Sequence, residues 1–116
     1  MTTKDILKNY HEYRNLVIYY DRKITSLLRM GHTPPGDLLP ARVRYEHLVS
    51  AIECAIFNVT DPTEQLLLRL RYIEGWSWTK VSLTIHYSRS QTKRIHAKAL
   101  AHLEQYGQWT VPDWIK

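Results

Sequence analysis

The fold of this chain is decided by residues 61–103, which read DPTEQLLLRLRYIEGWSWTKVSLTIHYSRSQTKRIHAKALAHL. Apolar residues recur there at steps of three and four, and cap residues interrupt them, so the stretch predicts a compact unit of three helices. No segment of the chain alternates apolar and polar residues as a half-buried strand would. We therefore expect an all-α protein. The three helices are expected at residues 62–74, from Ser77 to about Ile85, and from Ser88 to about Tyr106.

The first of these helices has clear start and stop signals. Asp61 suits the N-cap, Pro62 the first helical position and Glu64 the reciprocal position of a capping box. Gly75 suits the left-handed residue that ends a helix. The expected apolar face consists of Leu66, Leu67, Leu70 and Ile73.

The second and third helices are joined by a turn of about three residues, Ile85 to Tyr87, the length found in a helix-turn-helix. Such a turn commonly needs a left-handed residue, and histidine is one of the few non-glycine types enriched there, so we assign that role to His86. The period of the third helix places Thr92, Ile95, Ala99 and Leu103 inward. It places Arg89, Ser90, Lys93, Arg94 and Ala97 outward.

Charge in the second and third helices is one-sided, because no Asp or Glu occurs from Ser77 to Leu103. A cationic helix face of this kind suits a polyanion, and the alternative is the solvated face of an ordinary amphipathic helix. A recognition helix meets base edges with its N-terminal residues, so the base-reading candidates are Arg89, Ser90, Gln91 and Lys93. The phosphate-contact candidates are Ser77, Trp78, Lys80, Arg94 and Lys98.

Three segments of this unit resemble region 4 of bacterial sigma factors: residues 71–78, residues 88–90 and residues 94–103. The resemblance implies a helix-turn-helix that reads the −35 promoter element and contacts RNA polymerase. In a small protein behind a helical N-terminus, the unit is also similar to phage-encoded transcriptional regulators of the RinA and ArpU type, which control late genes. The resemblance covers residues 61–103 only. Because His86, Ser90 and Gln91 depart from the sigma pattern, it does not give the target sequence.

The N-terminal half predicts two long helices joined by a loop. Residues 4–30 carry a heptad seam formed by Ile6, Tyr10, Tyr13, Val17, Tyr20, Ile24 and Leu27, with no Pro or Gly to break it. Pro34 and Pro35 predict a loop over residues 31–40, and the next helix is expected at about residues 41–58. The seam permits either an antiparallel hairpin within one chain or pairing with a second chain as a homodimer. We thus expect a helical hairpin or dimerisation arm at 1–59, a DNA-binding module at 60–106, and an aromatic tail at 107–116 that packs on the body.

Composition limits the remaining function classes. The 116 residues fit one small domain with possible extension, 44% are hydrophobic, and the formal net charge is +5. Cys54 is the single cysteine, which excludes a disulfide within the chain and suits a reducing compartment, where we expect it in the core. No apolar run is long enough to span a bilayer, and the first residues do not resemble a signal peptide. We expect a cytoplasmic, nucleoid-associated protein of a bacterial host.

No spacing of His, Cys or carboxylates fits a metal or catalytic site, so we expect no metal, no cofactor and no enzymatic activity. The expected partner is double-stranded DNA, with RNA polymerase as a further partner. Two rival functions share these features. One is a small terminase-like DNA-packaging subunit, which would assemble into rings, and the other is a sigma-like module that binds polymerase without binding DNA.

Overall fold

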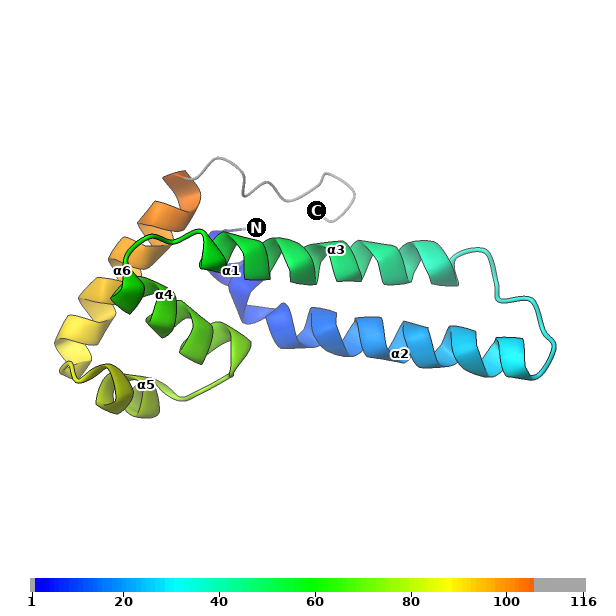
Figure 1. The fold of residues 1–116 in the computed structure, drawn as a ribbon, viewed down its shortest axis with the longest axis horizontal. Helices are drawn as coiled ribbons and strands as arrows, with labels where there is room; N and C mark the ends of the chain where they lie inside the picture. The colour runs from blue at the N-terminus through cyan, green and yellow to red at the C-terminus, as the bar shows by residue number, and fades with distance from the viewer. Residues whose placement is uncertain (1, 106–116) are drawn as a thin grey trace.

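The computed structural model describes residues 2–105, which form helices and connecting turns without any strand. The molecule is elongated, with extents of 56 × 28 × 20 Å. A two-helix arm projects from a cluster of shorter helices (Figure 1). The elements are α1 (Thr3–Lys8), α2 (Tyr10–Arg29), α3 (Leu38–Phe57), α4 (Pro62–Leu68), the π-helical turn η1 (Arg69–Ile73), α5 (Trp78–Ile85) and α6 (Arg89–Gln105).

The N-terminal seam is divided between two helices, so the prediction of one helix over residues 4–30 is wrong. Asn9 separates α1 from α2 with φ −91° and ψ 6°, and its own N–H bonds back to Ile6. Asparagine tolerates such a break because its short polar side chain competes with helical hydrogen bonding. The break lets α1 leave the line of α2 and pack against α6 (Figure 1).

The arm is an antiparallel pair of α2 and α3, which lie side by side as the intrachain alternative predicts (Figure 1). The ring of Tyr45 stacks with Tyr13 at 6.1 Å and with Tyr20 at 6.0 Å between centroids. Arg42 Nε donates to Asp21 Oδ1 across the pair at 2.7 Å. Helix α3 begins three residues earlier than expected because Pro40 falls in its first turn, where a backbone N–H has no helical partner to lose.

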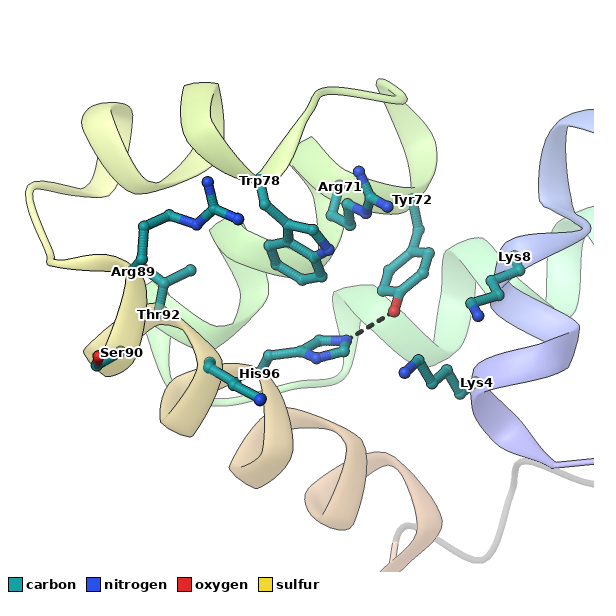
Figure 2. A pocket seen from close by; sticks show the side chains of 10 residues that line it. Lys4, Lys8, Arg71, Tyr72, Trp78, Arg89, Ser90, Thr92 and His96 are labelled. Atoms are coloured by element: carbon teal, nitrogen blue, oxygen red, sulfur yellow. Dashed lines mark hydrogen bonds between the residues drawn. The ribbon is translucent and has the colours of Figure 1, made fainter.

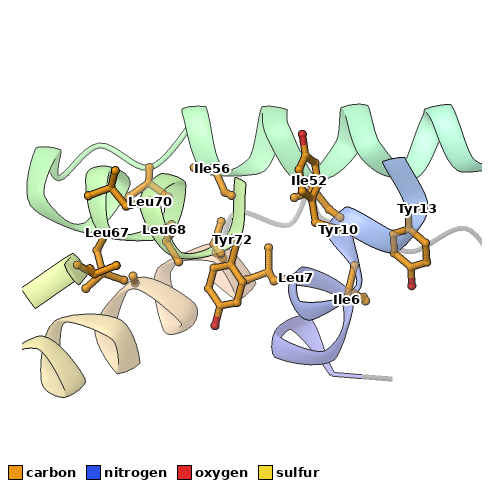
Figure 3. Close-up of a cluster of buried hydrophobic side chains, with 14 of the residues drawn as sticks. Ile6, Leu7, Tyr10, Tyr13, Ile52, Ile56, Leu67, Leu68, Leu70 and Tyr72 are labelled. Atoms are coloured by element: carbon orange, nitrogen blue, oxygen red, sulfur yellow. The ribbon is translucent and has the colours of Figure 1, made fainter. Parts of the chain in front are cut away.

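One continuous core joins the root of this arm to the C-terminal helices, and it crosses the expected module boundary near residue 59 (Figure 3). Leu67 and Leu68 of α4 are both fully buried, whereas Leu66, expected to face inward, is 39% exposed. Within α4 the buried residues Glu64, Leu67 and Leu68 follow the regular i, i+3, i+4 spacing, which leaves Leu66 on the outer side, and the π-helical turn affects only the residues from Arg69 onward. The fully buried side chains include Ile6, Leu7, Ile52, Ile56, Leu67, Leu68, Val81, Ala99 and Leu103.

Two further expectations fail at single residues. Cys54 is exposed rather than in the core, because it lies two positions from the buried Ile52 and so falls on the opposite side of α3. Glu64 does not complete a capping box. Asp61 caps α4 alone, accepting from the N–H groups of Thr63 at 2.9 Å and Glu64 at 3.0 Å, while the buried Glu64 carboxylate lies 2.6 Å from His102 Nδ1.

Within residues 2–105, no helix combines the length and the apolar character that crossing a membrane requires. The same residues contain no group of three His, Cys, Asp or Glu placed to hold a metal ion. The aromatic tail at 107–116, expected to pack on the body, lies outside the described residues.

Candidate nucleic-acid interface

The unit formed by α5, the turn at residues 86–88 and α6 is built from local signals. Ser77 caps α5 by accepting from the N–H of Lys80 at 3.3 Å. His86 ends the helix in the left-handed conformation, with φ 63° and ψ 38°, and is the one non-glycine residue with positive φ among those described. The assignment of the turn to His86 is therefore confirmed, and so is the left-handed Gly75, with φ 74°.

Helix α6 begins with a reciprocal cap between Ser88 and Gln91. The Gln91 N–H donates to Ser88 Oγ at 3.2 Å, and the Ser88 N–H donates to Gln91 Oε1 at 3.3 Å. Thr92 Oγ1 adds a bond to the Ser88 carbonyl at 2.8 Å. This cap fixes where the exposed first turn of α6 starts.

The inner side of α6 differs from the expected one at a single position. Thr92, Ala99 and Leu103 are buried as expected, but His96 takes the place between them and Ile95 is only half-buried. The ring of His96 is held by Tyr72, whose hydroxyl lies 2.6 Å from His96 Nε2, and by the edge of Trp78 at 4.6 Å between centroids. A buried polar ring is acceptable there because Tyr72 satisfies its nitrogen.

Burial and nearby positive charge both lower the pKa of His96. Burial is the largest cause that lowers its pKa, followed by the charges of Lys4, Arg71 and Lys8, and the result is a pKa of about 4. The pKa of the Tyr72 hydroxyl is raised by burial. At neutral pH the pair is therefore uncharged, a neutral imidazole bonded to a neutral phenol.

The base-reading candidates Arg89, Ser90, Gln91 and Lys93 are all exposed on the first turns of α6. Arg89 is oriented by α5, because its Nη1 donates to Thr79 Oγ1 at 2.8 Å. The side-chain oxygen of Gln91, Oε1, accepts from Ser88 in the helix cap. The side-chain amide nitrogen Nε2 is therefore the group left for other contacts.

The phosphate-contact candidates fall into two groups. Arg94 and Lys98 are exposed along the outer side of α6. Ser77, Trp78 and Lys80 lie at the start of α5, where the Ser77 hydroxyl is the helix cap. The Arg71 guanidinium lies over the half-buried Trp78 ring, 4.7 Å from its centre. Lys80 Nζ lies 3.9 Å from the centre of the Trp76 ring.

A hollow of about 480 Å³ opens beside the first turns of α6, between α1, η1 and α5 (Figure 2). We call it the basic hollow. Its cationic lining residues are Lys4, Lys8, Arg71, Arg89 and Lys93, and its other lining residues are Tyr72, Trp78, Ser90, Thr92 and His96.

Three base-reading candidates line the basic hollow: Arg89, Ser90 and Lys93. They lie there together with Lys4, Lys8 and Arg71, which the sequence did not indicate as site residues. Lys4 and Lys8 are separated by one helical turn of α1, a spacing that could have marked them as a pair on one face. Nothing local indicates that they face α6, since that depends on the break at Asn9. Gln91, Lys80, Arg94 and Lys98 lie outside the lining of the hollow.

Comparisons with family models, with curated proteins and with solved structures find no significant match to this chain.

Proposed function

We propose that this chain is a sequence-specific DNA-binding transcriptional regulator in which α6 enters the major groove of duplex DNA. The observation that carries the proposal is the first part of α6, which is exposed, cationic and free of acids, and follows a short turn with a left-handed residue. This is the arrangement in which a recognition helix presents its N-terminal side chains to base edges.

The roles of the side chains follow from their chemistry. Arg89 can bridge the two acceptors on the major-groove edge of guanine, and its bond to Thr79 limits the directions in which its guanidinium extends. Ser90, Gln91 and Lys93 add donors beside it. Arg94 and Lys98 lie farther along the helix, where they would contact phosphates and set the register without reading sequence.

The resemblance to sigma region 4 and to RinA- and ArpU-type regulators extends this proposal to late genes of a phage or prophage, with bacterial RNA polymerase as a partner. In the same proposal the arm of α2 and α3 supports a homodimer. Ile18 and Tyr19 of α2 and Val43 of α3 are exposed apolar side chains on that arm, which is consistent with a second chain covering it.

The proposal is tested by comparing Arg89→Ala with Lys98→Ala on a specific site and on random duplex DNA. We expect Arg89→Ala to weaken specific binding by about 1–3 kcal/mol and to relax base preference. We expect Lys98→Ala to weaken binding to both DNAs alike and to reduce the slope of log affinity against log salt by about 0.9. Footprinting around the chain's own gene supplies the specific site. Identical behaviour of the two variants on both DNAs would contradict this division of roles.

A second candidate function is a module that binds RNA polymerase without binding DNA. It is favoured by Leu83 of α5 and by Tyr87 in the turn, which are 72% and 42% exposed beside the cationic face. Large apolar side chains at such exposure suit a protein surface better than a phosphate backbone. Co-purification with polymerase, together with no salt-dependent affinity for duplex DNA, would establish this function in place of the first.

A further inference from the structure

The lysines of α1 bring an unexpected concentration of charge to the basic hollow. Lys4 and Lys8 come from the start of the chain, Arg71 from η1, and Arg89 and Lys93 from α6. In Figure 2 the ammonium ends of Lys4 and Lys8 point towards the hydroxyl of Tyr72, across the space from α6. Three separate elements therefore direct cations into one space.

No carboxylate of the described residues forms an ion pair with these cations. The ion pairs found among the described residues join Arg42 to Asp21 and Glu46, and His102 to Glu64, all away from the hollow. Asp5 is the acid nearest in sequence to both lysines. Its carboxylate accepts a hydrogen bond from the Thr2 hydroxyl at 2.8 Å, and its pKa is lowered first by Thr2 and also by the charge of Lys8, so Asp5 offsets part of that charge without forming an ion pair.

The groups between the cations are suited to an anionic ligand as well. Arg71 is fixed in place by a bond from its Nη1 to the Trp76 carbonyl at 2.9 Å and by its contact with Trp78. Burial, and after it the charges of Lys4, Arg71 and Lys8, lower the pKa of His96, which is in keeping with positive potential at the inner wall of the hollow. An arginine held rigidly among lysines is an arrangement that recognises phosphate oxygens.

We propose that the basic hollow binds a phosphate group that Lys4 and Lys8 of α1 and Arg71 of η1 contact, while Arg89 and Lys93 of α6 line the same hollow. The volume lies in the range of small-ligand sites. The phosphate has two sources. It belongs to the backbone of a bound duplex, an alternative that rests on the proposed function, or to a free phosphorylated molecule.

The test uses the full chain and the double variant Lys4→Gln, Lys8→Gln. The matched control is Arg22→Gln, Lys23→Gln, which removes two exposed cations from α2 outside the hollow. Inorganic pyrophosphate at low salt, followed by calorimetry, probes the free ligand. The salt dependence of affinity for a random duplex probes the DNA backbone. Circular dichroism melting verifies that each variant is folded.

We expect the α1 double variant to lose pyrophosphate affinity by about tenfold or more, or to reduce the salt slope for duplex DNA by about 1–2, and the control to do neither. A change with pyrophosphate alone assigns a free phosphorylated ligand, and a change in the salt slope assigns the DNA backbone. The proposal is overturned if neither quantity changes, or if the control changes as much. Absence of duplex binding by the unmodified chain would instead refute the proposed function. The pyrophosphate measurement would still show whether the basic hollow binds phosphate.

Discussion

Acid should destabilise this protein through His96, and replacing that one residue should remove the effect. The folded-state pKa of about 4 lies below the ordinary value of 6.5. Between these two values the unfolded chain binds a proton that the folded chain does not. The free energy of unfolding contributed by His96 is therefore fully present above pH 6.5 and is lost progressively as the pH falls toward 4.

The size of the loss follows from the same two values. A difference of about 2.5 pH units corresponds to about 3.4 kcal/mol at 1.36 kcal/mol per unit. The hollow opens the site to solvent and salt, which screen the charges of Lys4, Lys8 and Arg71, so we take about 2 kcal/mol as the expected loss. That is a large share of the stability of a chain this small.

The measurement is urea unfolding, followed by circular dichroism, at several pH values between 7.5 and 4 for the unmodified chain and for His96→Gln. Glutamine keeps a polar group near the Tyr72 hydroxyl and does not titrate, while all other groups titrate equally in both proteins. The unmodified chain should lose about 2 kcal/mol more than the variant over this range. Equal losses in the two proteins would refute the assignment to His96, whatever the absolute stability of the variant.

Further expectations concern packing and the backbone, and denaturant unfolding measures each of them. Gly75→Ala and Gly31→Ala should each cost about 1–2 kcal/mol, because both glycines have φ +74°. The cost should be greater at Gly75, where an added Cβ would lie 3.0 Å from His11 Nε2, and equal costs would show that this contact relaxes freely. Leu67→Ala should cost about 2–5 kcal/mol because the side chain is fully buried, and a cost below 1 kcal/mol would contradict tight packing around α4. Ser82→Ala should gain about 1 kcal/mol, since the buried Ser82 hydroxyl has no hydrogen-bond partner among residues 2–105, and a loss would indicate a partner such as water.

The caps and left-handed stops of the C-terminal helices were predictable because their signals are local. Asp61, Ser77 and Ser88 each cap a helix with their own side chain, and His86 and Gly75 adopt the left-handed conformation that their positions require. These residues act within three or four positions of themselves, so the sequence carries the whole cause.

What could not be predicted depends on distant partners. His96 faces inward because Tyr72, on another element, satisfies its ring nitrogen. Leu70 and Tyr72 are buried within η1, whose wider turn the apolar spacing of the sequence does not indicate. Lys4 and Lys8 meet α6 only because the chain breaks at Asn9, where the heptad pattern gave no sign of a break. The base-reading and phosphate-contact roles stay predictions until DNA binding is measured.

The break at Asn9 has a mechanical consequence. Because Tyr10 of α2 and Ile56 of α3 are buried in the same core as Leu103 of α6, the arm cannot swivel about Asn9 without exposing those side chains to water. A partner that binds the far end of α2 and α3 would thus transmit force to α6 through a rigid helical arm some tens of ångströms long. Excising residues 1–59 would strip the C-terminal helices of part of their interior, so the fragment should not be expected to fold as a separate piece.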